Sequence, residues 1–109
     1  MEKIYNKLVR DKIEDIIKQE GERPKTRILE KPEKIRELLR KLEEEVKEII
    51  SAKENMPELA KEIGDALEVI DAIIEECGLD KVEVLKMKAE RKEKRGGFSR
   101  GLFLESVDN

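Results

Sequence analysis

The stretch KIRELLRKLEEEVKEII, residues 34–50, contains a regular row of apolar residues among charged ones. The apolar residues recur at steps of three and four, which is the spacing of one face of an α-helix. Because a helix turns by about 100° per residue, they form a single stripe. This pattern predicts a long helix over about residues 33–53, directly after Pro32. The stripe comprises Ile35, Leu38, Leu39, Leu42, Val46, Ile49 and Ile50.

A shorter helix is predicted upstream, over about residues 11–20. Asp11 and Glu14 have the spacing of a capping box, in which two side chains bond the free backbone groups of the first turn. The segment between the two helices, ERPKTRILEKP at residues 22–32, has no helical period and contains two prolines. It is expected to be a connector, with an extended run at residues 26–29.

Two more helices are predicted downstream. The first covers about residues 57–77, begins at a proline and is ended by Gly78. The second covers about residues 80–94 and opens with another capping-box pair, Asp80 and Glu83. Four helices and no strand pattern predict an all-α fold, a small domain of the four-helix bundle type formed by residues 1–109.

Apolar residues beyond the last helix and one cysteine are expected in the core of this bundle. The glycine-rich tail RGGFSRGLFLESVDN, residues 95–109, should pack its apolar side chains back onto the helices. Cys77 falls in the apolar pattern of the third helix and reads as core packing. The tail residues concerned are Phe98, Leu102, Phe103 and Leu104.

Composition excludes several classes of chemistry. The chain has no histidine, which removes imidazole base catalysis, Ser-His-Asp triads and most zinc sites. Its single cysteine forms no internal disulfide, which fits a reducing cytoplasm. Charged residues make up 47% of the chain, but the net charge is only −3, which favours neither nucleic-acid nor membrane binding. No apolar run approaches the ~18 residues of a membrane span, so a cytoplasmic protein is expected.

Carboxylates lie against the apolar stripes of the second and third helices. Glu45 and Glu48 flank one edge of the stripe over residues 33–53, and Glu62 falls inside the apolar arc of the next helix, with Asp65 at its margin. In each pair the residues are three apart, so their side chains are neighbours. Two antiparallel helices joined by a short loop would bring the two pairs together.

Such a cluster is unfavourable unless a cation compensates it. Two carboxylates ~5 Å apart repel by roughly 3 kcal/mol at an effective dielectric constant of ~20. A divalent ion reverses the sign, and oxygen ligands favour Mg²⁺, with Mn²⁺ as the other candidate. Two alternatives stay open: the carboxylates are ordinary solvated helix surface, or arginine and lysine side chains pair with them across the helix interface.

A basic stripe is predicted on the fourth helix. Its members recur at helical spacing, and such a row of donors near a metal-holding cluster suits a polyphosphate. A solvated basic face paired with neighbouring glutamates is the alternative. The members are Lys88, Arg91, Lys92 and Arg95.

The acidic pattern resembles that of a known family. KLEEEVKE, residues 41–48, is followed after thirteen residues by EIGD, residues 62–65, and this is similar to the E-E-x-x-E…E-x-x-D signature of MazG-type nucleotide pyrophosphohydrolases of the all-α NTP pyrophosphatase superfamily. The opening YNKLVRDKI and the later KRGGF resemble a small subgroup described as phosphoribosyl-ATP pyrophosphohydrolase-like.

The resemblance implies a helical bundle that hydrolyses a nucleoside triphosphate to the monophosphate and pyrophosphate with Mg²⁺. It implies Glu45, Glu48, Glu62 and Asp65 as metal ligands. One glutamate, Glu45 by preference and otherwise Glu48, would orient or deprotonate the attacking water. By analogy, the basic stripe of the fourth helix would contact the phosphates. Asn6, Lys7 and Arg10 belong to the opening motif, but their spacing gives no independent support for a place in the site.

Two questions stay open at the level of the sequence, the substrate and the functional class. The substrate is a house-cleaning nucleotide or, alternatively, phosphoribosyl-ATP. A non-catalytic helical module that binds a partner protein is the rival from another functional class. The apolar stripes on thin helices predict exposed patches on a monomer, and therefore a homodimer or a higher homo-oligomer.

Overall fold

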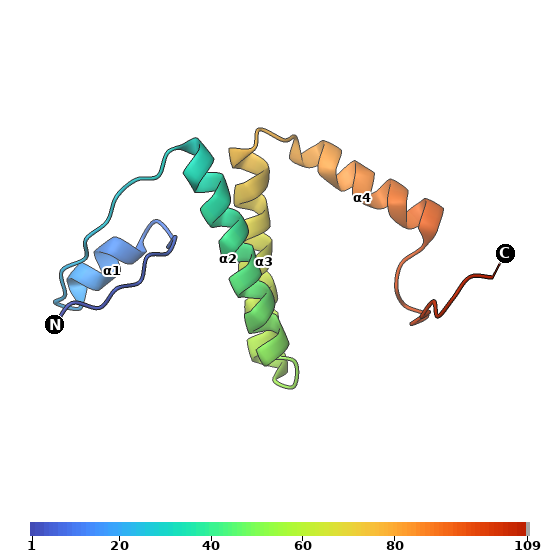
Figure 1. Ribbon diagram of the computed structural model, residues 1–109, viewed down its shortest axis with the longest axis horizontal. Coiled ribbons are helices and arrows are strands. Elements are labelled where there is room, and N and C mark those ends of the chain that lie inside the picture. The colour runs from blue at the N-terminus through green and yellow to red at the C-terminus, as the bar shows by residue number, and fades with distance from the viewer. Residues whose placement is uncertain (109) are drawn as a thin grey trace. The chain divides into compact units, whose positions relative to one another are not determined.

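The computed structural model describes residues 1–108, and its regular elements in that range are all helices (Figure 1). The predicted all-α class is confirmed, with four helices and no strand among the described residues. The chain divides into two compact units, Met1–Gly78 and a second one that begins at Leu79. The helices are α1 (Ile13–Gln19), α2 (Lys31–Ser51) and α3 (Met56–Glu76) in the first unit and α4 (Lys81–Arg95) in the second.

The α2 helix begins two residues earlier than predicted, so that Pro32 lies inside its first turn. Proline is tolerated there because the backbone N–H that it lacks has no partner within the helix. The start of α2 is tied to the preceding connector by Arg27, whose guanidinium donates to Glu33 at 2.6 and 3.0 Å. This arginine lowers the pKa of the Glu33 carboxyl. The predicted extended run at residues 26–29 is not a strand.

The α3 helix has a capping residue that the sequence patterns did not single out. The Asn55 side chain accepts a hydrogen bond from the backbone N–H of Glu58 at 3.2 Å, and Pro57 occupies the first turn as predicted. At the other end the chain leaves the helix through Gly78, whose φ of +69° is a left-handed conformation that glycine adopts readily.

Helices α2 and α3 form a hairpin, with the two helices side by side (Figure 1). Their adjacent faces bury a small apolar core, and an ion pair at 2.8 Å between Lys34 Nζ and Glu76 Oε2 joins the start of α2 to the end of α3. The hairpin is the scaffold on which the predicted acidic residues are placed. Its buried apolar residues are Leu38, Ala52, Ala66 and Val69.

The first helix is shorter than predicted, and its capping box is wrong. α1 begins at Ile13 after Lys12, and no side chain caps it. The Glu14 carboxylate accepts a hydrogen bond from the Thr26 hydroxyl of the connector instead, so it is not available to the first turn of α1.

In the second unit, Asp80 caps α4 as predicted, but its side chain accepts from the Val82 N–H at 2.9 Å, one residue before the Glu83 N–H that a capping box uses. The tail was expected to pack its apolar side chains onto the helices, and this prediction is wrong. The side chains concerned are exposed: Phe98, Leu102, Phe103 and Leu104.

Cys77 was also expected in the core, and this prediction is wrong too. It directly follows the last residue of α3 and is exposed. The apolar spacing of α3 includes Cys77, but the helix ends at Glu76 and the cysteine that follows it is not buried.

Candidate metal centre

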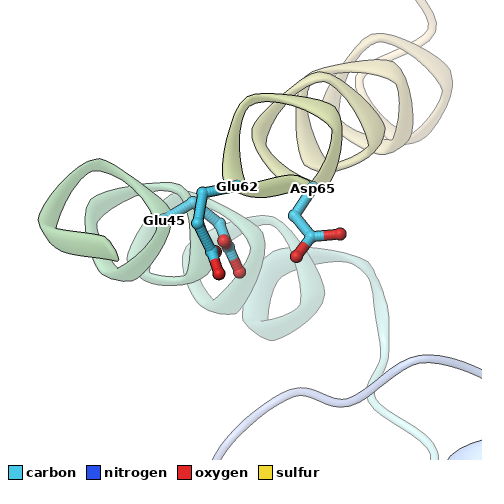
Figure 2. A group of neighbouring side chains, drawn as sticks. All are labelled: Glu45, Glu62 and Asp65. Atoms are coloured by element: carbon cyan, nitrogen blue, oxygen red, sulfur yellow. The ribbon is translucent and has the colours of Figure 1, made fainter. Parts of the chain in front are cut away.

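The hairpin brings three of the predicted ligands together. Glu45 lies in the middle of α2, and Glu62 and Asp65 lie one turn apart on α3. Each offers one carboxylate oxygen, and these oxygens all lie within 4.8 Å of one another. Figure 2 shows the three side chains projecting to the same side of the hairpin. We refer to Glu45, Glu62 and Asp65 as the acidic cluster.

Two members of the acidic cluster are withdrawn from water. Glu45 is 8% exposed and Glu62 is 6% exposed, whereas Asp65 is half-buried. Glutamates are rarely buried to this extent without a compensating charge. The cluster therefore has the setting in which a bound cation is most favourable.

The Glu45 carboxylate lacks compensation at one oxygen. Its Oε2 is buried and has no hydrogen-bond partner within residues 1–108. A buried acceptor that lost its water and gained no donor destabilises a fold by about 1–3 kcal/mol. A cation or a hydrogen-bond donor at this oxygen would remove that penalty.

Glu62 is electrostatically perturbed. Burial is the main cause that raises the pKa of its carboxyl above the ordinary value, and a side-chain hydrogen bond with Glu58 raises it further. The ammonium of Lys61, 3.7 Å from Glu62 Oε1, acts in the opposite direction. Asp65 adds like-charge repulsion. The net upward direction means that Lys61 does not fully neutralise this position.

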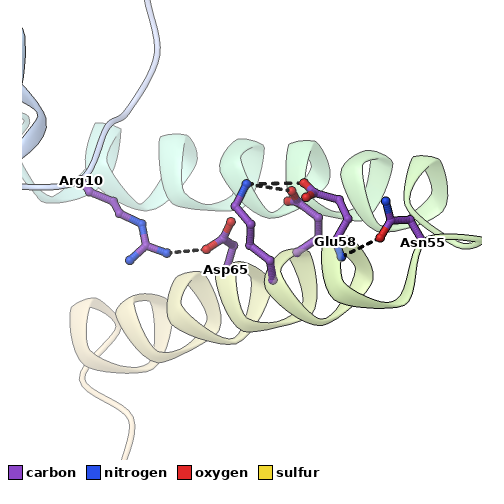
Figure 3. A network of polar contacts seen from close by, with 6 residues as sticks. Arg10, Asn55, Glu58 and Asp65 are labelled. Atoms are coloured by element: carbon purple, nitrogen blue, oxygen red, sulfur yellow. Dashed lines mark hydrogen bonds and ion pairs between the residues drawn. The ribbon is translucent and has the colours of Figure 1, made fainter.

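Basic side chains of the protein lie around the acidic cluster. Arg10 Nη2 donates to Asp65 Oδ1 at 2.8 Å (Figure 3). The Lys61 ammonium lies 3.4 Å from Glu58 and 3.7 Å from Glu62. The side chains of Arg10 and Lys61 are 59% and 65% exposed, so water weakens these ion pairs. They satisfy part of the negative charge from the surface, without reaching the buried oxygen of Glu45.

Not every predicted ligand joins the cluster. Glu48 is exposed on α2 and is not among the three carboxylates that meet. The contact between Arg10 and Asp65 is not predicted by spacing, since the two residues are 55 positions apart in the chain. Only the place of Arg10 in the opening motif pointed to it.

The predicted basic stripe of α4 lies in the second unit. Its four residues are exposed and line one surface hollow of about 730 Å³, together with the Gly96, Gly97 and Phe98 segment that follows the helix. The stripe is thus a continuous cationic surface of that unit. Its members are Lys88, Arg91, Lys92 and Arg95.

The donor set fits a small hard cation. Three carboxylate oxygens with no nitrogen or sulfur among them are the ligands that Mg²⁺ and Mn²⁺ prefer. Mg²⁺ usually keeps several waters and takes only a few protein carboxylates, which matches a cluster of three at the edge of a helix pair. Zinc and copper prefer imidazole or thiolate ligands, and none of these belongs to the cluster.

The opposite side of the hairpin is apolar. Val46 and Ile63 each follow a buried glutamate by one position, so each is rotated by about 100° from it. In antiparallel helices these two rotations point to the same side, away from Asp65. Large apolar residues continue this row and are at least a third exposed. The row comprises Leu39, Val46 and Ile50 on α2 and Met56, Ile63, Leu67 and Ile70 on α3.

Within the described residues, no helix combines the length and the apolar character that a membrane crossing requires. No protein-family model, curated protein or solved structure matches the chain.

Proposed function

We propose that the protein is a Mg²⁺-dependent hydrolase that converts a nucleoside triphosphate, of the non-canonical or house-cleaning kind, to the monophosphate and pyrophosphate. Glu45, Glu62 and Asp65 would hold the ion, which Mn²⁺ can replace. The similarity of the acidic pattern to the MazG-type pyrophosphohydrolases supports this reading. Nucleotides of this kind are cytoplasmic metabolites, so the proposed location is the cytoplasm.

The unpartnered oxygen of Glu45 is the observation that carries the proposal. Ion pairs with lysine or arginine account for part of the charge on Glu62 and Asp65, but they leave Glu45 Oε2 buried without a partner in residues 1–108. This oxygen would serve as a ligand to a divalent ion, whose charge would offset the repulsion within the cluster.

The proposed reaction needs no histidine. A water oxygen forms a bond to the α-phosphorus, the bond from that phosphorus to the bridging oxygen of the β-phosphate breaks, and pyrophosphate leaves with the electron pair. The proton of the water passes to a glutamate, Glu45 or Glu48. Bound Mg²⁺ would supply the positive charge that lowers the pKa of the water and neutralises the leaving group. Glu48, which is exposed and three residues from Glu45 on α2, would be accessible for this proton.

Phosphate contacts and self-association belong to the same proposal. The basic stripe of α4 is a candidate surface for the substrate phosphates. The apolar row on the hairpin is a candidate contact between two copies of the chain, because its side chains together present on the order of 600 Å², near the roughly 800 Å² that each partner buries in a stable interface. Its position opposite the acidic cluster leaves that cluster open in a dimer.

A panel of nucleotides tests the proposal. Canonical, oxidised and deaminated NTPs and dNTPs, together with phosphoribosyl-ATP, are assayed for pyrophosphate release with Mg²⁺, with Mn²⁺ and with EDTA. Release from at least one nucleotide is expected, with loss in EDTA and a fall of about 100-fold or more in Glu62→Gln. Glu43→Gln, which removes an exposed carboxylate of α2, should retain full activity. Absence of turnover with the whole panel at every metal concentration would refute the proposal.

The second candidate is a non-catalytic helical module that binds a partner protein. The ion pairs of Arg10 with Asp65 and of Lys61 with Glu62 favour it, since cations of the chain itself occupy part of the cluster. This candidate predicts no change in melting temperature on adding Mg²⁺. The enzyme predicts a rise, because an ion that binds only the folded state stabilises it.

A further inference from the structure

The segment that precedes α1 lies on the carboxylate side of the hairpin. Arg10 Nη2 lies 2.8 Å from Asp65 Oδ1, and Lys7 Nζ lies 3.9 Å from Glu44 Oε1 on α2 (Figure 3 shows the Arg10 contact). The first contact is on α3 and the second on α2, so this segment, residues 1–12, contacts both helices of the hairpin. It therefore places one positive charge on the acidic cluster, at Asp65, and a second one at Glu44, the residue before Glu45.

The backbone turns directly before Lys7. Asn6 has a φ of +46°, and among the described residues it is the non-glycine position with a left-handed backbone. Asparagine tolerates this conformation better than most residues, because its short side chain makes local hydrogen bonds. The turn gives the segment a defined shape at the point where it meets α2.

We propose that Lys7 and Arg10 bind the pyrophosphate portion of the substrate, that is, its β- and γ-phosphates, next to the metal at the acidic cluster. This inference rests on the proposed function and adds to it two residues and a substrate contact. It assigns the contacts to the β- and γ-phosphates to the segment before α1, which belongs to the same unit as the metal ligands, and leaves the α4 stripe as a candidate for the other phosphate contacts.

The chemistry of the two side chains fits this role. An arginine presents five N–H donors in a planar fork that matches two oxygens of a phosphate, and the Arg10 side chain is 59% exposed. Asp65 would help to hold the divalent ion, whose charge would replace that of Arg10 at this carboxylate. The guanidinium would then be available to donate to a phosphate of the substrate. Lys7, 43% exposed, adds a second positive charge on the α2 side.

Binding measurements separate this role from a structural one. Mn²⁺ affinity is measured by electron paramagnetic resonance, and affinity for inorganic pyrophosphate by calorimetry at saturating Mg²⁺, in the full-length protein. Arg10→Gln should tighten Mn²⁺ binding by about twofold to fivefold, because Asp65 loses a competing surface ion pair. It should weaken pyrophosphate binding by about tenfold or more. Lys7→Gln should weaken pyrophosphate binding and leave Mn²⁺ binding unchanged.

Matched variants make the result specific. Arg23→Gln removes an exposed arginine between α1 and α2 and should change neither affinity. Arg91→Gln tests the stripe of α4 as the rival source of phosphate contacts. The inference is overturned if Arg10→Gln leaves pyrophosphate affinity unchanged, if it weakens Mn²⁺ binding, or if Arg91→Gln alone abolishes pyrophosphate binding.

The failure of the proposed function looks different in the same experiment. If the unaltered protein binds no Mn²⁺, or if Glu62→Gln binds it equally well, the metal centre itself is refuted and the inference falls with it. If Glu62→Gln loses Mn²⁺ binding but Arg10→Gln leaves the pyrophosphate affinity unchanged, the metal centre is supported and only the assignment of Lys7 and Arg10 is refuted.

Discussion

Glu45 and Glu62 come from different helices of one hairpin, yet they direct carboxylate oxygens to within 4.8 Å of each other while both side chains are more than nine-tenths buried. A small α-helical hairpin gains no stability from such a pair of like charges. The arrangement is costly in the free protein and favourable when a cation binds.

The first prediction concerns pH. Burial raises the pKa of Glu62 above the ordinary 4.5, so the folded protein holds this proton more tightly than the unfolded chain does. This group's contribution to stability is therefore present at low pH and is lost as pH rises through the raised pKa. In EDTA, the melting temperature relative to Glu62→Gln should fall as pH rises from about 4 to 8.

Mg²⁺ should reverse this trend, because the ion binds the ionised carboxylate. Its stabilising effect should grow with pH over the same window and be absent in Glu62→Gln. Thermal denaturation across the pH range, with and without Mg²⁺, gives both curves. A metal-free protein whose melting temperature rises with pH relative to Glu62→Gln would contradict the prediction.

The second prediction concerns the unpartnered oxygen. Glu45→Leu replaces a buried carboxylate by an apolar side chain of similar size, so it should raise the free energy of unfolding of the metal-free protein by about 1 kcal/mol or more. It should also abolish stabilisation by Mg²⁺. Urea denaturation measures both effects. Glu43→Leu, two residues away and exposed, should not raise the free energy of unfolding.

The third prediction concerns the hairpin core. Leu38 is 5% exposed between α2 and α3, so Leu38→Ala should lower the free energy of unfolding by about 2–5 kcal/mol. Leu102→Ala, in the exposed tail, should change it by less than about 0.5 kcal/mol. Similar losses for both variants in urea denaturation would mean that the tail is as well packed as the hairpin.

The fourth prediction concerns self-association. Leu67 lies in the apolar row of α3, on the side opposite Asp65, so Leu67→Asp should convert a dimer to a monomer by placing charges in the contact. Ile28→Asp replaces an exposed apolar residue of the connector, outside the apolar row, and should leave the dimer intact. Analytical ultracentrifugation distinguishes the two species. A monomeric unaltered protein at all concentrations tested would refute the dimer.

The helices were predictable because their apolar residues repeat at three- and four-residue steps. Glu62 could be singled out for the same reason, since it interrupts an apolar arc of α3. The tail and Cys77 were misjudged because apolar character alone does not specify a packing partner, and Phe98 has none of the helical spacing that would show which surface it meets.

The site could be predicted only in part. The contact between Arg10 and Asp65 depends on the path of the irregular segment before α1. This segment has no repeating apolar pattern from which its path could be predicted. Glu48 follows Glu45 by the same three residues that separate Asp65 from Glu62, yet Asp65 joins the cluster and Glu48 is exposed outside it. Spacing defines which residues share a helix face, whereas burial depends on what covers that face.

The opposed sides of the hairpin have a consequence for binding stoichiometry. A second copy docked on the apolar row would leave the two acidic clusters facing outward in different directions, so one nucleotide cannot engage both. Each centre would then bind a nucleotide of its own, and a saturated dimer would hold two substrate molecules.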